Sequence, residues 1–261
     1  MNIAVCVKRA AEASEAEFEV TEPGELRARG LVYDLNEWDD YALEEALRIR
    51  EAHGGRVVAF TVGGPEDEEA LRKCLAKGAD EAVRVDAPPS LRDPYAVAKL
   101  LYAAMKKEHF DLVLTGAQAG DDGYALIPPM LAYLLKIPFA TLVKRVELRE
   151  GKVIAHRELE GGVEEVVELS LPALLSIQTG INEPRYVSIM GLRRASKKPL
   201  KVVSLQELSG LLEPLGGPQG WIEVVGYELP KLERRAQFLD GPADRAAASI
   251  IKILRERGLV A

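Results

Sequence analysis

Short apolar runs rich in β-branched residues alternate with amphipathic segments through the first half of the chain. We predict strands at IAVCV (3–7), RVVAFTV (56–62), EAVRV (81–85) and DLVLTG (111–116). Amphipathic segments near 39–52, 66–77 and 94–107 separate these runs and predict helices. Such alternation is typical of βαβ units, in which helices cover both faces of a parallel sheet. The predicted fold class is therefore α/β, with a Rossmann-like, parallel-core sheet and flanking helices.

The clearest of these helices is DDYALEEALRIREAHGG (39–55). Its apolar residues at 42, 43, 46, 47 and 49 form one face, and charged residues occupy the other. Asn36 lies just upstream and is the predicted N-terminal cap, while Gly54 is the predicted stop.

The pattern changes after residue 139. The segments TLVKRVELREG, KVIAHRELEGG and VEEVVELSLPALLSI predict hairpin strands added to the sheet, because Gly-containing turns separate them. Residues 178–199 form an irregular polar segment, and helical periodicity returns only at 242–258. We predict an α/β domain over 1–199 and a C-terminal arm over 200–261 that leans on its own domain or on another chain.

Composition narrows the classes of partner and compartment. The 261 residues are 48% hydrophobic and 29% charged, with a net charge of −7, which argues against nucleic acid as the main partner. No signal peptide and no run of 18 apolar residues is visible, so we predict a cytoplasmic protein without direct membrane insertion. Cys6 and Cys74 lie in core-like patterns, and neither Cys nor His clusters as metal ligands do.

The predicted ligand site is the segment from Gly116 to Ile127. Ligands of open parallel sheets bind beyond the carboxyl ends of strands, and this segment follows such a strand with unusual length. Gly116, Gly120 and Gly123 allow close approach of backbone to a ligand, and Pro128 with Pro129 suits a first helical turn. Backbone amides at that helix start would supply an anion site.

Two adjacent carboxylates in this segment, Asp121 and Asp122, have three interpretations. They are helix caps, they recognise hydroxyl or amine groups of a nucleotide, or they are general acid/base catalysts. Catalysis has the weakest support, because no nucleophile, histidine or metal-ligand cluster accompanies them. Beside a phosphate they would repel it, so they would face ribose or base. The residues alone support a nucleotide-binding α/β protein with no evident catalytic set.

Six segments together resemble the β subunit of electron transfer flavoprotein over nearly the whole chain. They are AVCVKR (4–9), NEWDDYALEEALRIRE (36–51), LRKCLAKGADEAVRV (71–85), GAQAGDD (116–122), ELEGGVEEVVELSLPALLS (158–176) and NEPRYVSIMGLRRASKKP (182–199). The resemblance implies an adenine-nucleotide-hydrolase-like sheet and a heterodimer whose α subunit holds most of the FAD. The β subunit would bind AMP or, in electron-bifurcating members, a second FAD.

In that family the β subunit is part of an electron carrier rather than a self-sufficient enzyme. The pair would take electrons from flavoprotein dehydrogenases to a membrane quinone reductase or another acceptor. The C-terminal arm would wrap on the α subunit.

The resemblance also implies site residues. Those for the cofactor are Cys6, Asn36, Glu37, Trp38, Asp39, Val62, Gly116, Gln118, Ala119, Gly120, Asp121, Asp122, Gly123, Tyr124, Ala125, Leu126 and Ile127. AMP-type members commonly carry Asn-Gln-Thr-Gly where this chain has Ala125, Leu126, Ile127 and Pro128. The D-x-x-x-A-x-[VI]-x-P pattern (121–129) and YALE (41–44) look closer to the branch with nitrogen-fixation-associated and bifurcating members.

Two features of the resemblance concern redox partners. Tyr186, Ile189 and Met190 would recognise partner dehydrogenases, with Ile189 as the protruding aliphatic anchor, and Trp38 would approach the flavin of the α subunit. The alternatives are an adenine-nucleotide-binding hydrolase and a stress-type nucleotide sensor. The hydrolase would need a Gly- and Ser-rich pyrophosphate loop after the first strand, and KRAAEASEAEF (8–18) does not provide one.

Overall fold

The computed structural model describes residues 1–12, 16–21, 25–88, 91, 93–229, 236 and 238–260. The chain divides into two compact units. The first comprises Met1–Phe18 and Arg27–Val225, and the second comprises Glu19–Leu26 and Gly226–Ala261.

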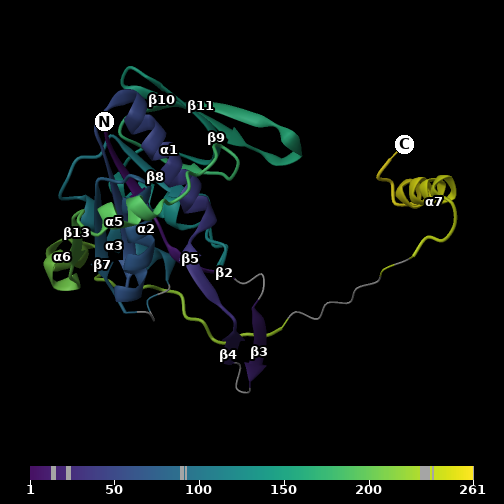
Figure 1. Cartoon of the computed structure of the whole chain (residues 1–261), viewed down its shortest axis with the longest axis horizontal. Coiled ribbons are helices and arrows are strands. Elements are labelled where there is room, and N and C mark those ends of the chain that lie inside the picture. Colours follow the sequence, from purple (N-terminus) through teal and green to yellow (C-terminus); the bar gives the residue numbers. More distant parts are fainter. Residues whose placement is uncertain are drawn as a thin grey trace. The chain divides into compact units, whose positions relative to one another are not determined.

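A nine-stranded sheet forms the centre of the first unit (Figure 1). Its spatial order is β11 (Glu164–Ser170), β10 (Lys152–Glu158), β9 (Phe139–Arg149), β12 (Ala173–Ile177), β8 (Leu112–Gly116), β1 (Asn2–Cys6), β6 (Arg56–Gly63), β7 (Glu81–Asp86) and β13 (Leu200–Val203). In this order the strands from β9 to β13 pair in parallel, whereas β10 pairs antiparallel with both β9 and β11. The predicted α/β class, its parallel core and its added hairpin strands are confirmed.

Helices cover both faces of this sheet. One face carries α1 (Glu37–His53), α2 (Glu68–Lys77) and α5 (Ile189–Ala195), and the other carries α3 (Pro94–Met105), α4 (Ile127–Leu135) and α6 (Leu205–Leu212). Leu43 and Leu47 of α1 are fully buried against the side of β1 that presents Ile3. Leu101 of α3 packs on the opposite side with Ala4. Alternate residues of one strand therefore serve two apolar cores.

Other elements lie outside the large sheet. β2 (Arg9–Glu12) pairs antiparallel with β5 (Val32–Leu35), and β3 (Glu17–Thr21) pairs with β4 (Glu25–Arg29). The sequence did not predict these four strands, since their side chains are largely exposed and show little apolar alternation. The second unit contains α7 (Ala243–Glu256), which confirms the helix predicted near 242–258.

The first unit extends beyond residue 199, where the sequence placed the start of the arm. β13 joins the sheet beside β7, and Leu208 and Leu212 of α6 are buried against α3. Ser204 and Glu207 form a capping box at the start of α6. The boundary between the two units lies at Val225, and the arm that remains is shorter than predicted.

Two buried charged side chains, one on α3 and one at its N-cap, hold the last part of the first unit. The ammonium of Lys99, 1% exposed, donates to the carbonyl oxygens of Gly217 and Gln219, each at 2.6 Å. Asp93 caps α3 by accepting the N–H of Ala96, and its other oxygen accepts the N–H of Trp221 at 2.7 Å. These side chains fix the backbone near the point where the chain leaves the first unit.

We predict that Lys99→Met lowers the free energy of unfolding by about 1–3 kcal/mol, because the carbonyl groups of Gly217 and Gln219 lose the buried ammonium that donates to them. Urea unfolding of the full chain measures this change. Lys107→Met, an exposed lysine just past the end of α3, is the matched control. Equal loss in both variants would contradict a structural role for Lys99.

Candidate functional site

The residues predicted to bind a nucleotide gather at the carboxyl ends of three parallel strands. β1 lies between β6 and β8, and the helices that follow β1 and β8 pack on opposite faces of the sheet. Ligands of open α/β sheets bind where the connections diverge in this way. Cys6 and Val62 lie at the ends of β1 and β6, and the 116–127 loop starts at the end of β8.

Asp39 ties the ends of β1 and β8 to the first turn of α1. Its buried carboxylate accepts the backbone N–H of Lys8 at 2.8 Å through Oδ2 and that of Gly116 at 3.0 Å through Oδ1. Burial raises the pKa of Asp39 from 3.8 to about 7, although these hydrogen bonds act in the opposite direction. Both oxygen atoms therefore have a structural function in the middle of the predicted site.

Gly116 has no room for a side chain. A Cβ atom there would lie 2.4 Å from Oδ1 of Asp39 and 2.7 Å from Cβ of Trp38. The indole of Trp38 donates through Nε1 to Oε1 of Gln178 at 3.1 Å, and Gln178 donates in turn to Glu158 at 3.2 Å. The start of α1 is therefore packed closely against the end of β8 and the residue after β12, and Gln178 links it to the end of β10.

Asn36 does not cap α1 as the sequence predicted. It occupies the N-cap position, but its side chain accepts no hydrogen bond from the backbone N–H groups of the first turn. Its amide nitrogen donates to the carbonyl of Gln118 at 2.9 Å, and its carbonyl oxygen accepts the N–H of Gly120 at 3.1 Å. Asn36 thus fixes the first half of the 116–127 loop.

Asp121 and Asp122 form ion pairs with one lysine. The ammonium of Lys8 lies 2.5 Å from Oδ1 of Asp121 and 2.7 Å from Oδ2 of Asp122. Burial alone would lower the pKa of Lys8, but the hydrogen bonds to both carboxylates raise it above its ordinary 10.5. Neither aspartate caps α4, since that helix begins at Ile127. The interpretation of this pair as helix caps is wrong.

The second half of the loop has an unusual backbone. Gly123 and Ala125 have φ angles of +62° and +52°, in the left-handed region, and Ala125 does so as a residue with a Cβ atom. Tyr124 is 43% exposed, while Ile127 packs against the core on the α4 face. Exposed residues among the rest of the predicted set include Glu37, Gln118, Gly120, Asp121 and Asp122.

Cys6 contributes no reactive thiol to the site. It is 6% exposed and lies within the apolar core below α3 and α4. Burial, and secondarily the charge of Asp39, raises the pKa of this thiol well above its usual range. Its predicted contribution through the backbone stays a prediction.

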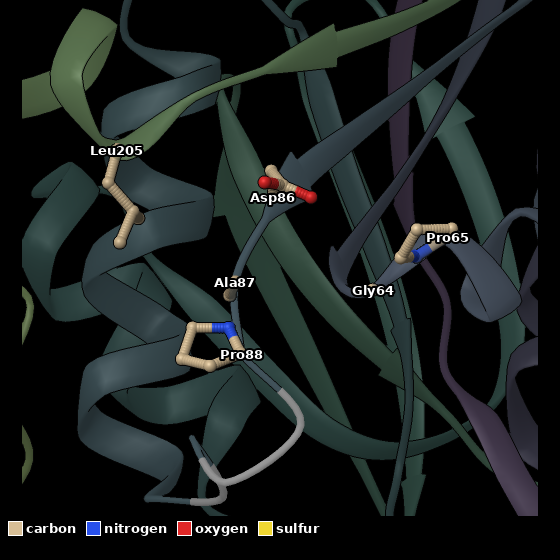
Figure 2. A pocket seen from close by; sticks show the side chains of 6 residues that line it. All are labelled: Gly64, Pro65, Asp86, Ala87, Pro88 and Leu205. Carbon is tan, nitrogen blue, oxygen red and sulfur yellow. The ribbon is translucent and has the colours of Figure 1, made fainter.

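Two shallow cavities lie near the same edge of the sheet. The first, of about 450 Å³, is lined by Gly64, Pro65, Asp86, Ala87, Pro88 and Leu205, at the ends of β6 and β7 (Figure 2). The second, of about 480 Å³, includes Gln178, Arg157 and Leu142. None of the predicted cofactor residues lines either cavity, although the second contains the partner of Trp38.

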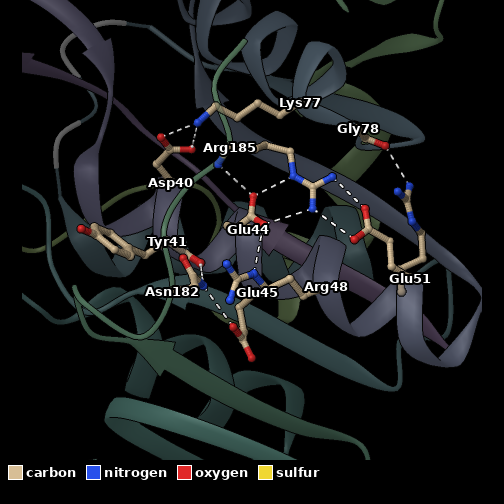
Figure 3. Close-up of polar contacts among 11 residues, drawn as sticks. Asp40, Tyr41, Glu44, Glu45, Arg48, Glu51, Lys77, Gly78, Asn182 and Arg185 are labelled. Carbon is tan, nitrogen blue, oxygen red and sulfur yellow. Dashed lines mark hydrogen bonds and ion pairs between the residues drawn. The ribbon is translucent and has the colours of Figure 1, made fainter. Parts of the chain in front are cut away.

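The segment 182–199, which we call the recognition segment, is held at its base by α1 (Figure 3). The guanidinium of Arg185 donates to both oxygen atoms of the buried Glu44, at 2.8 and 3.1 Å, and to Glu51 at 2.7 Å. Asn182 donates to the carbonyl of Tyr41 at 3.1 Å and to Glu45 at 3.0 Å. Burial alone would raise the pKa of Glu44, but the bonds from Arg185 lower it. Bidentate pairs of this kind fix geometry strongly.

The other end of the recognition segment is held by α2. Arg72 donates to the carbonyl of Ala195 at 3.1 Å, and Lys198 donates to that of Ala79 at 2.6 Å. Between the two ends, three side chains project into solvent: Tyr186 is 95% exposed, Ile189 75% and Met190 56%. The structure thus brings the three predicted recognition residues together on a well-anchored turn.

Known proteins with similar sequences identify the family. Residues 26–208 match the model of the electron transfer flavoprotein domain. The chain is 40% identical to the electron transfer flavoprotein subunit β of Methylophilus methylotrophus over 98% of both chains, and 37% identical to that of Bacillus subtilis (strain 168) over all of both. It is also 32% identical over the full length of both chains to the caffeyl-CoA reductase-Etf complex subunit CarD of Acetobacterium woodii.

The chain belongs to the electron transfer flavoprotein β-subunit family. This confirms the resemblance seen in the sequence and does not favour the hydrolase or sensor alternatives. Family membership gives flavin-related electron transfer as the function. Within the residues described, no helix is long and apolar enough to cross a membrane.

Several residues of this family member's site escaped prediction. Lys8 lay at a predicted strand end, but nothing in the sequence paired it with residues more than a hundred positions away. Gln178 had no local signature at all. The charged face of the predicted helix contained Glu44, Arg48 and Glu51. Nothing in that pattern indicated that Glu44 and Glu51 would pair with Arg185.

We predict that the stability of this protein depends on the ionisation of Asp39. Because its folded pKa, about 7, lies above the ordinary 3.8, the stabilisation from proton binding is complete below pH 3.8 and is lost as pH rises through 7. Asp39→Asn removes this dependence, so the substitution should destabilise more at pH 4.5 than at pH 7.5, by about 1–3 kcal/mol. Urea unfolding at the two pH values measures the difference.

Glu37→Gln is the control for Asp39→Asn, since Glu37 is an exposed carboxylate in the same helical turn. We expect it to change stability little at either pH. A destabilisation by Asp39→Asn that is equal at both pH values would show that Asp39 is ionised in the folded protein throughout this range.

Proposed function

We propose that this chain is the β subunit of a heterodimeric electron transfer flavoprotein that passes electrons from flavoprotein dehydrogenases to a quinone reductase or another acceptor. The observation that carries the proposal is the recognition segment, whose base is fixed by Arg185 and whose exposed side chain Ile189 is free to enter a pocket. A projecting apolar side chain on a rigid base is well suited to a central contact in a transient complex.

In this proposal the α subunit holds the FAD, which supplies the redox chemistry when bound. The carboxylates of Asp39, Asp121 and Asp122 are engaged in hydrogen bonds or ion pairs, which favours structural roles over roles in proton transfer. Trp38 is half-buried and oriented by Gln178, and we propose that its indole lies against the flavin of the α subunit. The cytoplasm stays the predicted compartment.

The C-terminal arm is the proposed attachment to the α subunit. Ile250 and Ile251 of α7 are 48% and 47% exposed, and with Leu254 they form an apolar stripe at helical spacing. An exposed apolar stripe on an amphipathic helix is suited to packing on another protein. Asp93 and Lys99 fix the backbone near the point where the chain leaves the first unit, so the arm starts from a defined place.

Co-expression with an α subunit from the same organism tests the proposal. We expect a stable 1:1 complex that carries FAD and is reduced by a flavoprotein dehydrogenase. Size-exclusion chromatography with light scattering measures the stoichiometry, and the visible spectrum reports the flavin. Two chains that purify separately, with no bound flavin, would overturn the proposed function.

Replacing Ile189, the proposed anchor of the recognition segment, should weaken binding of the dehydrogenase. We predict that Ile189→Ala raises the KM for the dehydrogenase about tenfold or more, because a contact of this kind is worth at least ~1.4 kcal/mol. Steady-state reduction of the complex by the dehydrogenase measures KM. Val166→Ala, which removes an aliphatic side chain 58% exposed on β11, is the control. Equal KM values for the two variants would exclude Ile189 as the anchor.

A further inference from the structure

A nucleotide phosphate at the start of a helix is usually held by free backbone N–H groups and by polar side chains. The family resemblance implies AMP or a second FAD in the β subunit, with its phosphate near the end of the 116–127 loop. The start of α4 is therefore where such a phosphate would be held.

The first turn of α4 lacks most of the donors that a phosphate needs. The helix starts at Ile127, and the next two residues, Pro128 and Pro129, have no N–H group. The N–H of Met130 already donates to the carbonyl of Leu126. The side chains of Leu126 and Ile127 have no polar atoms. Of the first three residues of this helix only Ile127 has an N–H group, and no side chain of the turn adds a donor.

Several amides of the preceding loop are engaged inside the protein. The N–H of Gly120 donates to Asn36, that of Gly123 to the carbonyl of Ala119 at 2.9 Å, and that of Tyr124 to Asp122 at 3.1 Å. A phosphate would have to displace these bonds to reach the same donors. The loop is thus folded onto its own polar groups.

The charge of the loop is also unfavourable for a phosphate. Lys8 supplies one positive charge and is shared by Asp121 and Asp122, so the three groups together are net negative. Like charges close to one another in a partly shielded site repel, and within this group no spare cation offsets the repulsion. The lysine that a phosphate would attract already has two carboxylate partners.

We infer that the site of this chain binds no phosphate-bearing nucleotide, and that the ion pairs of Lys8 with Asp121 and Asp122 close the 116–127 loop in its place. Lys8 follows β1, so these contacts join the end of β1 to the loop after β8. A bound nucleotide at this edge would make the same connection. The inference rests on the proposed function for its context. It implies a heterodimer with one flavin, held by the α subunit, which is a simple carrier and not an electron-bifurcating complex.

The direct test is the nucleotide content of the purified αβ complex. The complex is denatured, and the released nucleotides are counted by liquid chromatography with mass spectrometry. We expect one FAD and no AMP per heterodimer. One AMP or a second FAD per heterodimer would overturn the inference. A complex without any FAD would instead count against the proposed function, while still supporting the inference about this chain.

The isolated chain provides the same test if no complex forms. Titration with AMP in a calorimeter should show no heat of binding for the wild-type chain at millimolar concentration. Binding with a dissociation constant in the micromolar range would overturn the inference, whatever the fate of the proposed function.

A variant designed to gain AMP binding tests whether the missing donors at the start of α4 are what excludes the nucleotide. Leu126→Gln, Ile127→Thr and Pro128→Gly together restore an amide, a hydroxyl and a backbone N–H at the start of α4. We expect this triple variant to bind AMP at least tenfold more tightly than the wild-type chain. If it folds as judged by circular dichroism and still does not bind AMP, the lack of these donors is not what excludes the nucleotide, and the inference loses its physical basis.

Loss of the lysine tests the closing role of the ion pairs. In Lys8→Met the two aspartates repel each other without a cation, so amide hydrogen exchange across residues 119–126 should become at least threefold faster, with no change in nucleotide content. Lys152→Met, which removes an exposed ion pair with Glu168 in the β10–β11 hairpin, is the control. Unchanged exchange in the loop of Lys8→Met would overturn the closing role.

Discussion

The buried carboxylate of Asp39 is the interaction on which the site depends. It accepts one backbone N–H from Lys8, beyond the end of β1, and another from the last residue of β8, so that the start of α1 and two strand ends form one rigid corner. A buried carboxylate is tolerated there because its oxygen atoms are satisfied. Its raised pKa shows that these bonds do not fully offset the cost of burying the charge. The same constraint requires glycine at position 116, because any side chain there would collide with Asp39.

Helix α1 connects this corner to the recognition segment. Asn36 and Trp38 at its start organise the loop after β8 and the end of β12, whereas Glu44 and Glu51, two to four turns later, hold the recognition segment. One helix thus relates the position of Trp38 to the position of the exposed Ile189. An electron carrier needs such a fixed relation, because the distance between flavin and docked partner has to be reproducible while the docking contact itself stays small and transient.

The sequence predicted the core of the fold because apolar periodicity is strong there. The runs at β1, β6, β7 and β8, and the helix from Asp39 onward, are buried on both faces or on one regular face. β13 and α6 were not predicted, because four residues of strand carry little pattern, although Ser204 and Glu207 formed a recognisable capping box. In the predicted site, Gly116 and the loop lie at the carboxyl end of β8, which the sequence predicted as a strand. The partners of Asn36 and Lys8 were not predicted, since each lies more than eighty residues away and only the folded sheet brings them together.

The loop after β8 is where this chain departs from what its family implies, and the departure follows from three local features. Two prolines occupy the helix start, apolar side chains stand beside them, and Lys8 is taken by two aspartates. The sharpest single test of a loop closed by ion pairs is a crystal structure of the αβ complex grown in the presence of AMP. We predict that Lys8 is still paired with Asp121 and Asp122 and that no nucleotide density appears beside α4. A phosphate bound at the start of α4, with Lys8 turned toward it, would contradict this interpretation of the loop.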